Sequence, residues 1–97
     1  MATYVTLYRW TEQGIKNVKG SPDRISAAKK AVEAQGGKLN NIYVTMGEYD
    51  LVAISEWPDE KAAIAFALAM GAQGNVRTTT MRALTQNEFA EIVKKMP

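Results

Sequence analysis

The sequence contains neither cysteine nor histidine among its 97 residues. Without cysteine there can be no disulfide and no thiolate nucleophile, so packing alone has to hold the fold. Without histidine, the chain lacks the commonest metal ligand and the one side chain that titrates near neutral pH unperturbed. A general base would have to be a carboxylate, a lysine or a tyrosine. The Asp and Glu residues show no ligand-like spacing, so we expect neither a metal site nor a cofactor.

An excess of one charge and long apolar runs are also missing. Lys and Arg number 12 against 10 Asp and Glu, and a net charge of +2 is too small to indicate a nucleic-acid partner. No apolar run reaches the length of a membrane span, and the N-terminus lacks a signal-peptide pattern. We therefore expect a cytoplasmic protein that binds neither nucleic acid nor membrane. The length fits one domain, residues 1–97.

The most informative stretch is Met46-Gly47-Glu48-Tyr49-Asp50, which separates two runs rich in β-branched and aromatic residues, 41–45 and 51–57. Such runs around a short glycine-containing break predict a β-hairpin. Gly47 can take the positive φ that a tight connection needs, and Asp50 can accept hydrogen bonds from nearby backbone N–H groups.

Before this hairpin, residues 3–10 alternate in the manner of a strand. Val5 and Leu7 share one face, which we assign to the helix side, and the other face carries Tyr4, Thr6, Tyr8 and Trp10. A polar connection, 11–19, with room for one irregular helical turn, comes next. Ser21-Pro22-Asp23 then begins a helix that ends at Gly36-Gly37.

After the hairpin, an alanine-rich helix is predicted from Glu60 to about Met70, with Ile64 and Leu68 as its larger anchors. Residues 75–83 form a fourth strand. A capping box at 85–88 then begins a terminal helix whose apolar stripe is Phe89, Ile92, Val93 and Met96. That helix can reach either its own sheet or the sheet of a partner.

This order of elements predicts an α+β fold, a ferredoxin-like βαββαβ sandwich with an extra C-terminal helix. Its four-stranded antiparallel sheet would carry both long helices on one face. The opposite face, called the open face below, has no cover within this order. We expect the helix-facing residues to include Val5, Leu7, Leu51, Ala53 and either Ile42 or Tyr43, since the pattern leaves the parity of the second and third strands open.

Several separated motifs agree in order and spacing with one family. They are Thr3-Tyr4-Val5-Thr6-Leu7, residues 10–17, residues 46–52 and Gly74-Asn75-Val76-Arg77-Thr78. Up to about Thr85 the chain resembles the GYD domain family, named for the Gly-Xaa-Tyr-Asp stretch seen here at residues 47–50. The resemblance implies the dimeric α+β barrel class, in which two sheets pack face to face, and hence a homodimer or a higher homo-oligomer. Barrel relatives include cofactor-independent monooxygenases, small isomerases, haem enzymes and ligand-sensing regulatory domains, but none of their catalytic motifs is matched.

Five residues are candidates for binding a ligand: Tyr8, Trp10, Tyr43, Glu56 and Arg77. Tyr8, Trp10 and Glu56 are expected to line a common cavity on the open face. Glu56 is the candidate for a catalytic base, provided that this cavity is partly dry. Alternatively, Glu56 caps a strand end or pairs with an arginine at the surface. Arg77 could hold a small anion or form a salt bridge across a dimer interface.

Three functions remain open at this point. The first is a homo-oligomer that binds a small molecule between the two sheets of a dimer. The second is a structural or regulatory assembly module without a ligand, whose open face serves self-association. The third is a cofactor-independent enzyme of the dimeric α+β barrel class.

Overall fold

Four antiparallel strands form one sheet in the order β2-β3-β1-β4. In the computed structural model, which describes all 97 residues, β1 spans Ala2–Trp10, β2 Lys38–Val44, β3 Leu51–Trp57 and β4 Val76–Ala83. β1 pairs with both β3 and β4, while β2 pairs with β3 as the hairpin predicted from the sequence. The ferredoxin-like fold is therefore confirmed.

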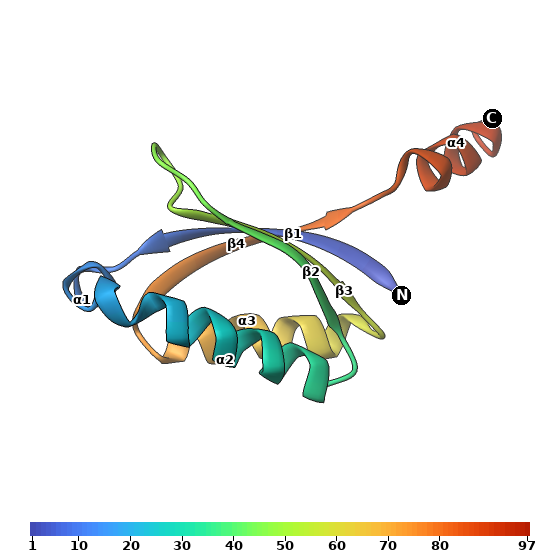
Figure 1. Cartoon of the computed structure of the whole chain (residues 1–97). Helices are drawn as coiled ribbons and strands as arrows, with labels where there is room; N and C mark the ends of the chain where they lie inside the picture. Colours follow the sequence, from blue (N-terminus) through green and yellow to red (C-terminus); the bar gives the residue numbers. More distant parts are fainter.

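Two long helices, α2 (Ser21–Ala34) and α3 (Glu60–Ala72), lie side by side against one face of this sheet (Figure 1). A short helix α1 (Glu12–Lys16) and a 3-10 turn (Val18–Gly20) connect β1 to α2. The chain ends with α4 (Gln86–Lys94). None of these helices has the length and apolar character needed to cross a membrane.

The core lies between the sheet and the two long helices. Val32 and Trp57 are 1% and 2% exposed and pack with Tyr4 and Ala63. The indole N–H of Trp57 donates a hydrogen bond to Ser55 Oγ at 3.1 Å, so its polar group is satisfied inside the core. The indole ring also packs against Phe66 of α3, with 5.3 Å between the ring centroids.

The side of β1 that faces the helices is the opposite of the one expected. Thr6 and Tyr8 line the space under α2 and α3, and Tyr4 belongs to the core cluster, so Val5 and Leu7 point to the open face. The assignment of Val5 and Leu7 to the helix side was wrong. The helices contribute the small side chains of Ala28, Ala63 and Ala67 at this contact, which leaves room for the larger Tyr4 and Trp57 of the sheet in the core cluster.

The structure shows which residues of the hairpin strands β2 and β3 face the helices, a point that the sequence left open. Leu51, Ala53, Ser55 and Trp57 are buried on the helix side, whereas Val52, Ile54 and Glu56 alternate with them. β2 has an irregularity between Leu39 and Asn41, which adds one residue opposite β3. Because of this bulge, Leu39 and Ile42 both face the helices, although they are three residues apart. Ile42, rather than Tyr43, therefore faces inward.

The two large side chains that were expected to anchor α3 on the sheet also face away from it. Ile64 and Leu68 are 51% and 70% exposed, while Ala63, Phe66 and Met70 face the sheet. α3 carries no charged residue after Lys61, so it is apolar on all sides. Sequence periodicity cannot identify the inner face of such a helix, because every face looks like a core face.

The terminal helix α4 does not fold back over its own sheet. It projects from the end of β4, on the side of the sheet opposite α2 and α3 (Figure 1). The predicted capping box is present: Glu88 N–H donates to Thr85 Oγ1 at 3.1 Å, and Thr85 N–H donates to Glu88 Oε1 at 2.9 Å. The hydrogen bonds from Thr85 hold the pKa of Glu88 below its usual value. The N-terminus of α4 is therefore well formed although the helix contacts no core.

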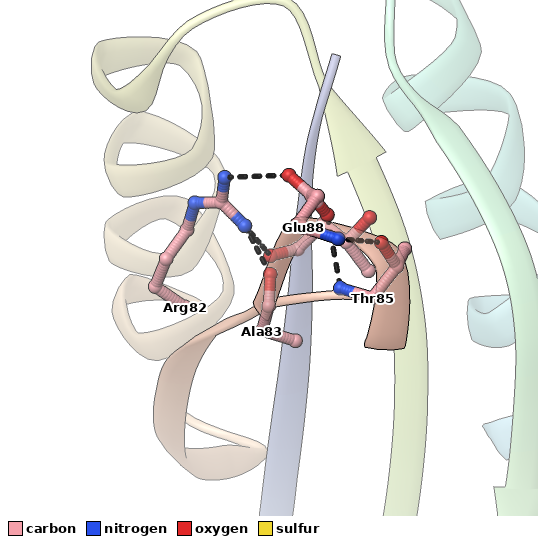
Figure 2. Close-up of polar contacts among 5 residues, drawn as sticks. Arg82, Ala83, Thr85 and Glu88 are labelled. Atoms are coloured by element: carbon pink, nitrogen blue, oxygen red, sulfur yellow. Dashed lines mark hydrogen bonds and ion pairs between the residues drawn. The ribbon is translucent and has the colours of Figure 1, made fainter. Parts of the chain in front are cut away.

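The link between β4 and α4 is held by Arg82 (Figure 2). Its guanidinium donates hydrogen bonds to the backbone carbonyls of Thr3, at 3.1 Å, and of Ala83. It also lies 3.7 Å from the Glu88 carboxylate. These contacts join the end of the sheet to the first turn of α4 and favour an extended direction for the helix.

Candidate functional site

The motif at residues 47–50 attaches the hairpin loop to the end of β1. Gly47 has a φ of 130°, which a side chain would disfavour, and this confirms its predicted role in the connection. Asp50 N–H donates to Tyr8 O at 2.8 Å, and Asp50 Oδ2 accepts a hydrogen bond from Trp10 N–H at 2.8 Å. Asp50 therefore continues the β1–β3 ladder with its side chain, as expected for a carboxylate that bonds backbone N–H groups.

The two residues before Asp50 contact the same strand from the open face. Arg9 forms an ion pair with Glu48 at 2.9 Å, and its guanidinium lies over the Tyr49 ring at 4.8 Å from the centroid. The Arg9 and Glu48 side chains are 51% and 71% exposed, so this pair adds little stability. Its role is to orient the loop on the end of β1.

A second pair of motifs meets beside the first. Thr11 N–H donates to Asn75 O at 3.0 Å, and the Thr11 hydroxyl donates to Gly74 O. The amide of Gln13 donates to Gln73 O at 3.1 Å and to Asn75 Oδ1 at 3.0 Å. Gly14 is buried so closely that a Cβ atom there would lie 1.9 Å from Asn75 O. Three of the four segments that resemble the GYD family, residues 10–17, 46–52 and 74–78, are thus spatial neighbours at one end of the sheet.

A cleft of about 70 Å³ opens beside these contacts, between the sheet and the first turns of α2. Aromatic and aliphatic groups form most of its wall, and the polar groups come from the start of α2 and from the end of α3 and the loop after it. The lining residues are Tyr8, Trp10, Ser21, Arg24, Ile25, Ala28, Ile42, Leu51, Met70, Gln73, Asn75 and Val76. The cleft is therefore an apolar recess with a polar rim.

Two ionisable groups, Tyr8 and Arg24, contribute to this lining. Burial raises the pKa of the Tyr8 phenol, because the apolar surroundings disfavour its charged form. The guanidinium of Arg24 donates to Asn17 O and to Ser21 Oγ, both at 3.0 Å. Arg24 is thus held in place by neutral acceptors and keeps its positive charge uncompensated by a carboxylate. A neutral phenol and an oriented cation suit binding of a small anion.

The structure divides the five predicted ligand residues between two faces. Tyr8 and Trp10 line the cleft on the helix side. Pairing places Glu56 opposite Thr3, Tyr43 opposite Val52 and Arg77 opposite Arg9, all on the open face. The expected common cavity of Tyr8, Trp10 and Glu56 is therefore wrong, because the parity of β1 is reversed. A ligand-binding role of the individual residues stays a prediction.

Glu56, the candidate base, lies at the end of β3 that is remote from the cleft. Asn40 Nδ2, at the β2 bulge, donates a hydrogen bond to Glu56 Oε2 at 3.0 Å. This contact matches the alternative in which Glu56 serves the end of a strand. The partner is an amide, however, and not an arginine.

Sequence reasoning missed the polar wall of the cleft. The local pattern around Ser21 indicates only a helix start, and nothing in it singles out Arg24. Gln73 and Asn75 lie in a stretch that is typical of a helix end and a strand entry. The signal that brings them together is the pairing of β1 with β4, which places Trp10 opposite Val76 and is not a local property of the sequence.

The open face forms a second candidate surface. Its centre is apolar: Val5 pairs with Ile54 and Met81, and Leu7 pairs with Val52. No element of the chain covers it (Figure 1). The hairpin tip and α4 rise beyond opposite ends of this face, and both carry exposed apolar side chains: Tyr43, Val44 and Met46 on the hairpin, and Phe89, Ile92, Val93 and Met96 on and after α4.

Comparison with known proteins finds the GYD domain family, whose profile matches residues 4–93. A curated relative from Thermus thermophilus, named glutamine synthetase and cystathionine beta-lyase binding protein, is 27% identical over 85 residues. That alignment covers 87% of this chain and 90% of the relative.

Solved structures with the same fold include the leucine response regulatory protein of Mycobacterium tuberculosis, with a TM-score of 0.60 and 16% identity. The alignment covers 88% of this chain but only 51% of that regulator, so this chain spans about half its length. A hypothetical protein from Pyrococcus horikoshii has a TM-score of 0.56 and 22% identity, with 89% and 93% of the two chains covered. A solved protein from Thermus thermophilus has a TM-score of 0.51 and 24% identity, with 88% and 95% covered.

Proposed function

Because this chain belongs to the GYD domain family, we propose that it is a homodimeric binding module that regulates a partner protein by contact. The observation that carries the proposal is the placement of its uncovered apolar surfaces. The open face and the outer side of α3 lie on opposite sides of the molecule. One can therefore serve self-association while the other binds a partner.

The open face is the surface that we assign to a second copy. Four strands of about eight residues, at about 3.3 Å rise and 4.8 Å spacing, present roughly 500 Å². Two such faces together bury about 1,000 Å², the lower end for a specific interface. α4 and the hairpin tip lie on the same side of the sheet as the open face (Figure 1), and exposed apolar residues such as Phe89, Ile92 and Met46 are available to add to this area. Face-to-face packing thus covers an apolar surface that no element of the chain covers.

Charges on the open face specify the direction of this packing. Arg77 pairs with Arg9 at the end of the sheet beside the hairpin tip, whereas Glu56 lies at the end beside α4. A two-fold axis across the strands turns the Arg77 end of one copy toward the Glu56 end of the other, although Arg77 on β4 and Glu56 on β3 are separated laterally by β1. The same axis turns the α4 end of one copy toward the hairpin end of the second copy.

The outer side of α3 is the surface that we assign to a partner protein. Ile64 and Leu68 are one helical turn apart and well exposed, and the exposed neighbours Ala65 and Ala69 widen the patch. A helix that is apolar on all sides is typical of one that is covered on all sides. A regulated enzyme is a suitable partner, since the curated relative is named for binding two enzymes.

The first experiment measures the mass of the protein in solution. Size exclusion with light scattering at micromolar concentration should give twice the 10.7 kDa chain mass. Leu7→Asp places a charge in the contact and should yield monomers. Lys30→Asp, on the exposed side of α2, is the matched control and should leave the dimer intact. A wild-type monomer would reject the assembly.

The second experiment tests partner binding separately. Purified glutamine synthetase and cystathionine beta-lyase, the partners in the relative's name, are immobilised and the chain is passed over them. Leu68→Asp should abolish binding and keep the dimer, whereas Lys61→Asp at the start of α3 should affect neither. Binding that survives Leu68→Asp would reject α3 as the contact surface.

A small-molecule function is the second candidate, and the cleft beside α2 is the observation that favours it. A cleft on the helix side stays open in a dimer that packs through the open face. This differs from the site first expected, which lay between the sheets. Between the sheets, the contact surface would consist of the apolar side chains of Val5, Leu7, Val52 and Ile54. These side chains can pack directly against those of the second copy.

A further inference from the structure

We propose that the cleft beside α2 binds a small aliphatic carboxylate, with Arg24 holding the carboxylate and the apolar recess holding the hydrocarbon body. The site is independent of the assembly proposed above, since none of its lining residues belongs to the apolar centre of the open face.

The charge of the lining selects an anion. Arg24 is the one residue of the lining that is charged at neutral pH, and no carboxylate compensates it. Its Nη1 and Nη2 atoms each donate to a neutral oxygen, of Asn17 and of Ser21. These bonds orient the guanidinium and leave further N–H groups for a ligand, because a guanidinium has five donors. The geometry is thus prepared before the ligand arrives, which lowers the entropic cost of binding.

The start of α2 strengthens this preference. The helix begins at Ser21, and the residue before it, Gly20, provides no side-chain cap. The Ser21 N–H already donates to Val18 O and Pro22 has no N–H, so the helix contributes its dipole here rather than these donors. Ser21 and Arg24 both line the cleft, so the positive end of a 14-residue helix lies at its edge. An anion at the rim would experience this partial charge together with that of the guanidinium.

The recess limits the size and character of the rest of the ligand. Ile25, Ile42 and Val76 give it aliphatic walls, with Trp10 and Tyr8 beside them. A volume of about 70 Å³ is roughly half that of an engineered cavity that accepts benzene. A branched chain of about four carbons therefore fits better than an aromatic ring.

The lining also discriminates against amino acids. An α-amino acid brings an ammonium group next to its carboxylate, and the cleft offers no acidic side chain to pair with it. The ammonium would lie close to the Arg24 guanidinium and be repelled. We therefore expect 3-methylbutanoate to bind more tightly than valine, which has the same carbon skeleton with an added ammonium group.

The test uses ¹⁵N-labelled full-length protein and three matched probes: 3-methylbutanoate, its neutral amide 3-methylbutanamide, and valine. Titrations followed by amide chemical shifts should show saturable changes at cleft residues with 3-methylbutanoate. The neutral amide and valine should bind at least about tenfold more weakly, the loss expected for one charge-assisted hydrogen bond. Equal shifts with the carboxylate and the amide would overturn the assignment of Arg24, and shifts confined to other regions would overturn the site.

Two variants separate the charge from the recess. Arg24→Gln should weaken 3-methylbutanoate binding at least about tenfold, while Arg82→Gln, at the opposite end of the sheet, should leave it unchanged. Because Arg24 also bonds Asn17 and Ser21, its replacement changes the loop as well as the charge, so Ala28→Leu provides a second route. This change fills the recess and keeps Arg24, and it should abolish binding of the probe. Full binding by folded Ala28→Leu protein would contradict the proposal.

Discussion

At the scale of single residues, the most informative side chains link one segment of the chain to the next. Asp50 joins the hairpin loop to β1 by accepting the Trp10 N–H at 2.8 Å. Arg24 joins α2 to the turn before it by donating a hydrogen bond to Asn17 O, and it also donates to Ser21 Oγ within α2. Of the two, only Arg24 lines the cleft, and neither is part of the core cluster.

Asp50→Ala should lower the free energy of unfolding by about 1–3 kcal/mol, because it leaves the Trp10 N–H without its charged acceptor. Glu48→Ala is the matched control in the same loop. Its exposed ion pair with Arg9 is worth less than about 1 kcal/mol. Urea denaturation of the two variants measures the difference, and equal losses would contradict this role of Asp50.

The buried phenol of Tyr8 makes the stability of the fold depend on pH in alkaline solution. Burial raises its pKa in the folded state above the ordinary value of about 10. Between these two values the unfolded chain loses the phenolic proton while the folded chain keeps it. Stability from this group is therefore complete below about pH 10 and falls as the pH rises from there through the folded value.

Tyr8→Phe should remove this part of the alkaline loss, so its urea midpoint should fall less between about pH 9 and 11 than that of the unchanged protein. Tyr43→Phe, whose side chain is exposed on the open face, serves as the control and should behave like the unchanged protein. An identical alkaline loss in all three proteins would show that Tyr8 does not contribute.

At the scale of elements, short connections position the long helices and strands. α1 packs so closely on the start of β4 that its glycine is required: a Cβ atom at Gly14 would meet Asn75 O at 1.9 Å. Gly71 of α3 has open surroundings instead, since a Cβ atom there would contact nothing within 4 Å. The two glycines therefore have different structural roles although both lie in helices.

Gly14→Ala should destabilise the fold by about 3 kcal/mol or more, because the backbone of Asn75 has to move. Gly71→Ala should instead stabilise it by up to about 1 kcal/mol through the better helix propensity of alanine. Thermal unfolding of both variants checks the opposite signs. A mild effect at Gly14 would mean that α1 is free to shift away from β4.

At the scale of the whole molecule, apolar surface remains on three sides: the open face, the outer side of α3 and the stripe of α4. α4 has a formed capping box and no core of its own. Short helices are marginal in isolation. The proposed dimer turns the hairpin end of the second copy toward α4 and would give this helix additional contacts.

The direction of the dimer can be tested by charge exchange. Glu56→Arg should weaken the dimer, because it turns a cation toward the Arg77 end of the second copy, and Arg77→Glu should weaken it by turning a carboxylate toward the Glu56 end. The double variant restores opposite charges and should recover most of the lost affinity. Analytical ultracentrifugation measures the four dissociation constants, those of the unchanged protein and of the three variants. Additive losses in the double variant would contradict the two-fold axis across the strands.

The sequence by itself determined the order of elements, the hairpin around Gly47, the capping box of α4 and the family. These depend on local propensity, turn chemistry and short-range hydrogen bonds, all of which are visible within a few residues. The tertiary structure decided which face of each element points inward. Val5 and Leu7 face outward because Tyr4 and Trp57 take the inward positions against small side chains such as Ala63 on α3. It also decided the site: Trp10, Arg24 and Asn75 share one cleft only because β1 pairs with β4 and α2 returns over them.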